Sequence, residues 1–401
     1  MSSLRYGRIT PRRVAGAVRR RIQRRLNGFT RPDNPAPDWA AAQFPPLPDS
    51  PVILGIGPAN FAGQGWAWKQ AVEHFVDGVS VEVFAVQRPT FNFPSDRPIQ
   101  AAWYRDRSWQ DAQYDRVLNG YTHVLAEAVR PVFGLKYGDT LGADLPVLRA
   151  AGKPVAILLH GSEIRRPDAH ARRHPHSPFS DSQDELVTVL QAQAIRLGRI
   201  VSTFLADGVG PVFVSTPDLL DDVPDATWLP VVVDLARWHS ELVPMSRERP
   251  VVVHVPTRAK MKGSDLVDPQ VQGLADRGLI EYRRCSDVDP ADMPALIADA
   301  DIVLDQFALG SYGVSAVQAM AAGRVTVGHV ADHVRARIPA PLPIVEATPL
   351  TIVEVLERLV AERDAARTIA ADGVDFAREF HNGRRSAQVL APFLGRPLRV
   401  G

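Results

Sequence analysis

From Pro51 onward, short apolar runs alternate along the chain with longer segments of helical periodicity. Short apolar runs bounded by turn residues are typical of strands buried in a parallel sheet. We expect strands at Val52–Ile56, Val79–Val86, Val155–His160, Val212–Ser215, Val251–Val255, Leu279–Arg283, Asp301–Phe307 and Val325–Val330. Strands that alternate with helices predict parallel α/β layers.

Helical segments occupy the intervals between these strands. The clearest are Gly65–Phe75, Gly313–Ala322 and Ile352–Ala370, and the last repeats apolar residues every three to four positions. A short polar, Pro-containing stretch at 234–250 divides the pattern into two successive α/β units. We therefore predict an α/β protein made of two Rossmann-like domains that face a central cleft.

The first 50 residues follow a different pattern. Within residues 5–26, apolar side chains recur every four positions among arginines, and residues 31–50 are rich in proline. An apolar stripe on a cationic helix is typical of a segment that lies on an anionic membrane surface. A solvated tail and a helix packed on its own domain remain open as alternatives. We read residues 1–50 as an arm and linker, 51–240 as a first domain completed by 385–401, and 241–384 as a second domain.

Charge is unevenly distributed along the chain. The formal net charge of +1 hides ten arginines and no acidic residue within positions 1–31, which leaves 36 basic against 45 acidic residues in the remainder. No aromatic-lined basic groove accompanies the arm, so we expect no nucleic-acid partner. Only five of the 46 basic residues are lysines, which is typical of a GC-rich bacterial genome.

Several classes of protein are excluded by composition. Cys285 is the sole cysteine, which excludes a disulfide framework and a thiolate zinc site. The chain has no run of about 20 apolar residues, so we expect no membrane-spanning helix. We predict a cytoplasmic protein that can dock on the inner face of the membrane through residues 5–26.

The first strand runs into a glycine-rich turn, PVILGIGPANFAGQGWAW, that opens a helix. Gly57, Gly63 and Gly65 would let backbone N–H groups approach a phosphate at the positive end of that helix. The dinucleotide-binding pattern fails, because Asn60 occupies its third glycine position. Close packing of strand against helix explains the glycines equally well.

A basic segment, HVPTRAKMKGSD, follows the first strand of the second unit. Arg258, Lys260 and Lys262 cluster where a loop enters a helix at the carboxyl edge of a parallel sheet, which is where ligands bind in open α/β folds. Guanidinium and ammonium groups both suit a diphosphate. A solvated basic loop is the alternative.

The segment DIVLDQFALGSYGVSAVQAMAAGRVTVG carries the strongest functional signal. A buried strand ends at Asp305, a loop of small residues holds Gly310, Ser311 and Gly313, and a helix follows. Small residues allow backbone amides and the helix N-terminus to come close to a ligand. Gln318 lies within this helix, where it could reach a sugar hydroxyl or be a plain polar residue on the helix flank.

These two segments resemble the second domain of GT-B glycosyltransferases of the family 4 (group 1) retaining type. The resemblance spans about residues 51–395 and extends to LHGSEIR at 159–165 and TWLPVVVDL at 227–235. The segment FHNGRRSAQVLAPFL resembles the helix that crosses back onto the first domain of such enzymes.

The resemblance implies a hexosyltransferase that needs no cofactor or metal, with a UDP- or GDP-linked sugar bound by the second domain and an acceptor by the first. It implies that Arg258 and Lys262 contact the diphosphate and that His160 faces the reacting centre as a further catalytic residue. The expected donor-binding residues are Gly57, Gly63, Gln64, Gly65, Asp305, Gly310, Ser311, Tyr312, Gly313 and Gln318. The basic arm points to a glycan or lipid-linked acceptor of the cell envelope.

The chain departs from the family pattern at two positions. The pattern has two glutamates separated by seven residues, and Gly310 and Gln318 stand at these positions. Glutamine can still bind a ribose hydroxyl, and Asp305 or Ser311 could replace the missing acid. The missing glutamate at Gly310 leaves open a binding protein without turnover. A nucleotide-sugar epimerase with the same fold is a second alternative.

Other candidates lie in the first domain. Glu163 and Arg165 are candidate acceptor-binding residues, although Glu163 could instead cap a helix or pair with Arg165. We expect the histidines of AHARRHPHSP (His170, His174 and His176) to lie in an exposed loop and not to bind metal. The acidic pair Asp221 and Asp222 is expected to be solvated.

Overall fold

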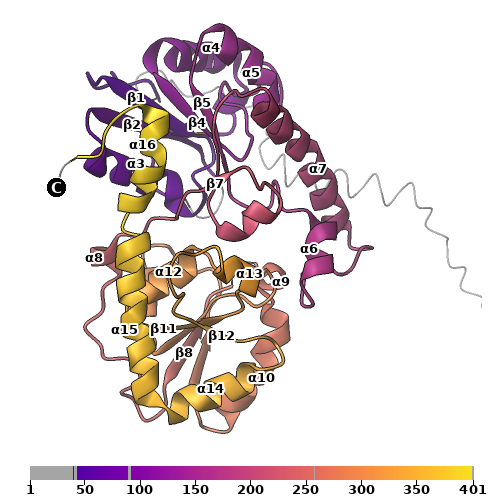
Figure 1. Cartoon of the computed structure of the whole chain (residues 1–401), viewed down its shortest axis with the longest axis vertical. Helices are drawn as coiled ribbons and strands as arrows, with labels where there is room; N and C mark the ends of the chain where they lie inside the picture. The colour runs from indigo at the N-terminus through magenta and orange to yellow at the C-terminus, as the bar shows by residue number, and fades with distance from the viewer. Residues whose placement is uncertain (1–38, 40–42, 89–91, 257, 400–401) are drawn as a thin grey trace, which may run out of the picture.

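The computed structural model describes residues 39, 43–88, 92–256 and 258–399. The predicted membrane-binding arm of residues 5–26 lies outside them. Figure 1 shows two α/β halves arranged one above the other along the longest axis of the molecule. We call the part that carries the N-terminal sheet the first half and the part that carries the other sheet the second half.

The sheet of the first half has seven parallel strands in the order β3-β2-β1-β4-β5-β6-β7. They are β1 (Val52–Gly57), β2 (Val79–Val86), β3 (Arg97–Ile99), β4 (His123–Glu127), β5 (Val155–Leu159), β6 (Val212–Val214) and β7 (Thr227–Trp228). All five residues of β5 are buried, as expected for a parallel sheet covered on both faces. The sequence pattern predicted β1, β2, β5 and β6 but missed β3, β4 and β7.

Helices cover both faces of this sheet (Figure 1). They are η1 (Phe61–Gly63), α3 (Gln64–Phe75), η2 (Trp103–Arg105), α4 (Arg107–Asp115), η3 (Arg116–Gly120), α5 (Leu141–Ala150), α6 (Pro167–Arg173), α7 (Glu185–Ala206) and η4 (Pro217–Asp221). Trp68 and Val72 of α3 are fully buried against Leu54 and Ile56 of β1. Asp184 caps the start of α7, because its side chain accepts a hydrogen bond from the Leu186 N–H.

The second half is built on five parallel strands in the order β12-β11-β10-β8-β9. They are β8 (Val251–His254), β9 (Glu281–Arg284), β10 (Ile302–Leu304), β11 (Val325–Gly328) and β12 (Ile344–Glu346). The covering helices are α8 (Leu235–Trp238), α9 (Ala259–Lys262), α10 (Ser264–Asp276), α11 (Met293–Ala298), α12 (Val314–Ala321), α13 (Asp332–Arg335), α14 (Ile352–Ala361) and α15 (Arg363–Phe380). The sequence pattern missed only β12 among these strands.

The prediction of one helix over Ile352–Ala370 is wrong. The segment contains the end of one helix, α14, and the start of another, α15, because Glu362 between them has the non-helical backbone angles φ −104° and ψ 56°. Apolar residues continue with helical spacing on both sides of Glu362, so the periodicity alone gives no sign of the break.

The end of the chain returns to the first half, as predicted. Helix α15 covers the second half, and α16 (Arg384–Leu394) then packs against α3 (Figure 1). Leu390 and Leu394 are buried in the same core as Trp68. Beyond α16, Leu398 pairs with Val76 in an antiparallel bridge.

Two chain segments connect the halves, one between β7 and α8 and the other between α15 and α16, and they are hydrogen-bonded to each other. The His381 carbonyl accepts a hydrogen bond from the Val233 N–H at 2.9 Å, and the His381 ring donates from Nδ1 to the Val231 carbonyl at 2.7 Å. Among the described helices, none is both long and apolar enough to cross a membrane.

Candidate active site

The carboxyl ends of the two sheets point toward each other. Hydrogen bonds join the loops that follow β5 and β6 to the loop that follows β10: His170 contacts the Leu309 carbonyl at 3.2 Å, and the Ser311 hydroxyl donates to Asp218 at 2.6 Å. Ligands of open α/β folds bind at this edge.

His160 follows the last residue of β5 and is held by a buried carboxylate. Its Nε2 lies 3.2 Å from Oε1 of Glu127, at the end of the neighbouring strand β4. Oε2 of Glu127 accepts hydrogen bonds from the backbone N–H groups of Ala59 and Asn60 at 2.8 and 2.7 Å. One carboxylate thus fixes both the imidazole and the glycine-rich turn.

The ionised state of Glu127 is favoured by its partners. Burial alone would raise the pKa of this carboxyl, but the hydrogen bond and the charge of His160, together with the two backbone N–H groups, outweigh burial and lower the pKa. Sequence analysis missed Glu127. Its position at the end of a strand beside β5 could have identified it. That position can be recognised only if HVLAE is predicted to be a strand, and this strand, β4, was missed.

Two arginine side chains lie against the ring of Phe61, in the glycine-rich turn. The guanidinium groups of Arg88 and Arg130 lie 4.4 and 5.1 Å from the centre of the Phe61 ring, and the His160 ring meets the same ring edge-on at 4.9 Å. Burial, with the nearby charges of Arg130 and Arg258, lowers the pKa of Arg88 to about 10. Among the described residues, no carboxylate forms an ion pair with any of these three arginines. Sequence analysis identified only Arg258 of the three.

The predicted glycines of the turn serve close packing. A Cβ atom at Gly57 would lie 2.3 Å from the Phe84 carbonyl oxygen, and one at Gly63, where φ is +73°, would lie 2.9 Å from the Phe93 ring. Gly65 is buried beside Asn60. The Gln64 side chain is occupied, because its amide exchanges two hydrogen bonds with the backbone of Val232 at 2.7 and 3.1 Å.

The basic segment of the second half lies against the strand end at Asp305. Nζ of Lys262 is 3.3 Å from Oδ1 of Asp305 and 3.4 Å from the Ser315 hydroxyl. Oδ2 of Asp305 accepts from the Gly313 N–H at 3.4 Å. Arg258 is exposed at the start of α9. The structure therefore brings Lys262, Asp305 and Gly313 together.

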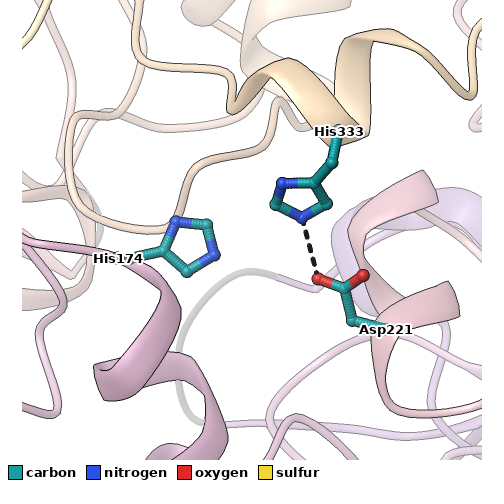
Figure 2. Close-up of side chains that lie close together, drawn as sticks. All are labelled: His174, Asp221 and His333. Carbon is teal, nitrogen blue, oxygen red and sulfur yellow. Dashed lines mark hydrogen bonds and ion pairs between the residues drawn. The ribbon is translucent and has the colours of Figure 1, made fainter.

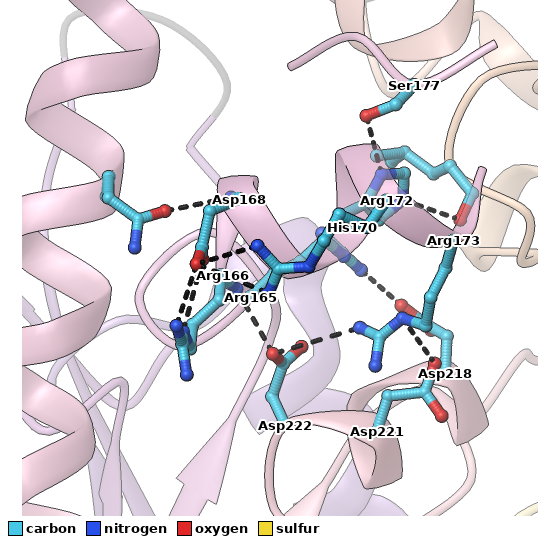
Figure 3. A network of polar contacts seen from close by, with 12 residues as sticks. Arg165, Arg166, Asp168, His170, Arg172, Arg173, Ser177, Asp218, Asp221 and Asp222 are labelled. Carbon is cyan, nitrogen blue, oxygen red and sulfur yellow. Dashed lines mark hydrogen bonds and ion pairs between the residues drawn. The ribbon is translucent and has the colours of Figure 1, made fainter. Parts of the chain in front are cut away.

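The small-residue loop after β10 is pressed against the first half. Gly310 has φ +64°, and a Cβ atom there would lie 2.5 Å from the His174 ring. Ser311 binds Asp218, whose other oxygen pairs with Arg165 at 2.5 Å (Figure 3). The position where the family pattern has a glutamate is thus filled by an imidazole from the first half.

The remaining predicted residues divide into buried and half-buried positions. Tyr312 is buried, with its hydroxyl 3.3 Å from Nε2 of His381, and Gln318 is half-buried on α12. Glu163 is buried and accepts hydrogen bonds from the backbone N–H groups of His160 and Gly161. The contact of Glu163 and Arg165 with an acceptor stays a prediction.

The expectation that the histidines lie in an exposed loop is wrong for two of them. His170 is on α6 and His174 directly follows it, and both are buried, with their rings stacked at 4.2 Å. Burial first, and neighbouring positive charges second, lower the pKa of His170 to about 3 and that of His174 to about 4. The Arg- and Pro-rich sequence around them gave no sign of burial, which comes from contact with the second half.

The acidic pair is not solvated as expected. The side chains of Asp221 and Asp222 are 9% and 4% exposed, and Arg173 lies 3.6 Å from the first and 4.0 Å from the second (Figure 3). From the second half, Arg337 donates to Oδ1 of Asp221 at 2.6 Å, and Nε2 of His333 lies 3.0 Å from Oδ2 (Figure 2). The contacts of Asp221 with Arg337 and His333 thus link the two halves.

Comparisons with known proteins identify the fold. No family model matches the chain, and a search of curated proteins finds no match. Solved structures do match. HepE from Anabaena, in complex with UDP and glucose, is 13% identical with a TM-score of 0.53 over 86% of this chain and 99% of its own. Sucrose-phosphate synthase from Thermosynechococcus elongatus is 14% identical, with a TM-score of 0.52 over 85% and 97%.

A third match is WaaG, described as a glycosyltransferase involved in lipopolysaccharide biosynthesis. It is 12% identical, with a TM-score of 0.50 over 86% of this chain and all of its own. The chain therefore has the fold of GT-B glycosyltransferases, with two Rossmann-like sheets and a returning C-terminal helix, which confirms the predicted fold.

Proposed function

We propose that this protein is a retaining glycosyltransferase of the family 4 type, which moves a sugar from a nucleotide-sugar donor to an acceptor held by the first half. One observation carries the proposal: the guanidinium groups of Arg88 and Arg130 lie against the Phe61 ring, which also contacts His160. The charge of Arg258, from the second half, contributes to the lowered pKa of Arg88, and none of the three arginines has an ion-paired carboxylate among the described residues. Concentrated positive charge at a partly buried place favours an anionic ligand such as a diphosphate. Because HepE was solved with UDP and with UDP-glucose, a UDP-sugar is the first donor to test.

Each residue has a proposed task in this reaction. Arg258 and Lys262 bind the donor diphosphate and stabilise the charge that develops as it leaves. His160, oriented by Glu127, donates or accepts a hydrogen bond at the donor sugar. An acceptor hydroxyl attacks the anomeric carbon from the face that the diphosphate leaves. The anomeric C–O bond to phosphate breaks, a new C–O bond forms, and the proton passes to a leaving phosphate oxygen.

Nucleotide binding tests the donor site. A nucleotide at about 100 times its Kd should add about 2.7 kcal/mol to the free energy of unfolding. We expect a melting-temperature rise with one of UDP, GDP, ADP or dTDP, and no rise in the double variant Arg258→Ala/Lys262→Ala. The matched control is Lys260→Ala, because Lys260 lies in the same helix but pairs with Asp184. If no nucleotide stabilises the wild type, or if the double variant responds equally, the donor site is wrong.

The positive charge on the first-half side of the site favours an acceptor that carries an anionic group. Arg88 follows β2 and Arg130 follows β4, so both belong to the first half, and they add two positive charges to those of Arg258 and Lys262. We assign this pair to an anionic group of the acceptor, as a phosphate-linked lipid or glycan would carry. Docking on an anionic membrane through residues 5–26 agrees with such an acceptor and stays a prediction.

Binding of inorganic pyrophosphate in the presence of saturating UDP tests the acceptor assignment. We expect the wild type still to bind pyrophosphate by titration calorimetry, and Arg88→Gln/Arg130→Gln to bind it at least tenfold more weakly, since a hydrogen bond to a charged group contributes about 1.5–3 kcal/mol. Arg199→Gln, an exposed arginine on α7, serves as the control. Displacement of pyrophosphate by UDP would assign the pair to the donor instead.

A second candidate function is nucleotide-sugar binding without turnover. The observation that favours it is the His174 ring against Gly310, where the family pattern has a glutamate. This candidate predicts a thermal shift with a donor but neither hydrolysis nor transfer to any of a broad set of acceptors. Analysis of the donor alone, without acceptor, would also reveal an epimerase through the new sugar it forms.

A further inference from the structure

Three side chains that the proposed reaction does not use converge at the contact between the halves. His174 follows α6 and Asp221 ends η4, both in the first half, and His333 comes from α13 in the second half (Figure 2). One ligand atom from each lies within 4.8 Å of the other two. We propose that His174, Asp221 and His333 bind one transition-metal ion of the Zn²⁺ class, and that the bound ion joins the two halves.

The donor set has the chemistry of a zinc site. Two imidazoles and one carboxylate are typical zinc ligands, and they leave a fourth tetrahedral position for water. Bonds of roughly 2.0–2.2 Å place tetrahedral ligand atoms about 3.4 Å apart. Nε2 of His333 and Oδ2 of Asp221 are 3.0 Å apart, and a ring nitrogen of His174 lies within 4.8 Å of both. The exposed His333 ring and the Asp221 carboxylate can therefore move toward His174 to close this spacing around an ion.

The ligands are held in place by their neighbours. Arg337 donates to Oδ1 of Asp221 at 2.6 Å and is itself held by the Pro217 carbonyl at 3.0 Å, which leaves Oδ2 turned toward His333. The His174 ring is fixed between the stacked ring of His170 and the backbone of Gly310. Neighbours that orient metal ligands in this way raise metal affinity.

A nearby arginine opposes the approach of a cation, but it keeps a carboxylate partner after the ion binds. Arg173 lies 3.6 Å from Oδ2 of Asp221, where its charge would oppose the ion. It also lies 4.0 Å from Asp222, whose side chain is 4% exposed. Arg173 therefore keeps a carboxylate partner when the ion takes Oδ2. His333 is 42% exposed, so the ion can enter from solvent on that side.

The bound ion would stabilise the contact between the two halves. Two of its ligands belong to the first half and one to the second, so binding favours the arrangement in which the halves touch. Gly310 and Ser311 lie in this same contact. The inference concerns metal binding alone and does not depend on the proposed glycosyl transfer or on nucleotide binding.

Titration of tag-free, chelator-treated protein with ZnCl₂ tests the site. We expect one Zn²⁺ per chain by calorimetry, confirmed by metal analysis after dialysis, and a rise in melting temperature. His333→Gln and Asp221→Asn should each weaken binding at least tenfold and abolish the thermal shift, because each removes one of three protein ligands. The matched control is His239→Gln, because His239 is an exposed histidine of the second half with a carboxylate partner, Glu241.

The deciding variant is His333→Gln. His174 is buried, so His174→Ala can lower stability for reasons of packing. His333 is 42% exposed, and the glutamine amide can still donate to Asp221, so His333→Gln should melt close to the wild type without metal. The proposal is overturned if the wild type binds no Zn²⁺ or if His333→Gln binds one equivalent as tightly as the wild type. It is also overturned if His239→Gln loses the ion equally.

Discussion

Replacing Glu127 by alanine is expected to lower the free energy of unfolding by about 2–6 kcal/mol and to abolish most of the proposed transferase activity. The variant leaves the buried N–H groups of Ala59 and Asn60 without an acceptor, and each unsatisfied buried donor costs about 1–3 kcal/mol. It also frees the His160 ring, so the imidazole no longer has one orientation. Urea denaturation measures the first effect, and the rate of sugar transfer measures the second.

Glu127→Gln separates the two effects. Both N–H groups bind the same oxygen of Glu127, so the glutamine carbonyl can still accept from both. Its amide nitrogen replaces the oxygen that faces His160. We expect this variant to remain within about 1 kcal/mol of the wild type in stability but to lose activity. Wild-type stability in Glu127→Ala would contradict the role of this carboxylate in the fold.

Asp218→Ala is expected to cost about 3–5 kcal/mol of stability, as measured by urea denaturation. The Arg165 side chain is only 11% exposed, and its ion pair with Asp218 keeps its pKa raised in spite of burial, which by itself would lower it. Removal of one partner leaves the other charge buried and unpaired, which is the costly case. Replacing both partners by apolar residues of similar size, as in Arg165→Met/Asp218→Leu, should recover much of the loss.

Two control variants identify the source of this effect. Ser311→Ala removes only the hydrogen bond across the halves and should cost about 1 kcal/mol. Asp207→Ala breaks an exposed pair with Arg149 and should cost less than about 1 kcal/mol. A cost for Asp218→Ala no larger than that for Asp207→Ala would show that the buried pair does not stabilise the protein.

Sequence reasoning found the elements whose signal is local. β1 and β2 in the first half and β8 and β11 in the second were predicted because their mostly apolar sequences reflect burial on both faces of a parallel sheet. β4 was missed because HVLAE begins with histidine and ends with a charged residue. Glu127 was missed with it, although this carboxylate organises the predicted turn and His160.

The residues whose burial was predicted wrongly are those that pack against the other half of the molecule. His174 and Asp221 lie in polar, arginine-rich sequence that is typical of a solvated surface, and they are covered only because the second half meets them. Arg88 and Arg130 are separated by 42 residues and share one aromatic ring. The spacing of residues along the sequence cannot reveal such long-range contacts, because they depend on the order of the strands in the sheet and on how the two halves pack together.

The return of α16 to the first half has a consequence for how the chain folds. Domains usually fold in order as the ribosome releases them. Here the core beside α3 lacks Leu390 and Leu394 until almost the whole chain has been made. The half that is synthesised first is therefore completed last, and its maturation is coupled to that of the second half. Premature termination anywhere before residue 384 would leave an apolar face of α3 uncovered and open to aggregation.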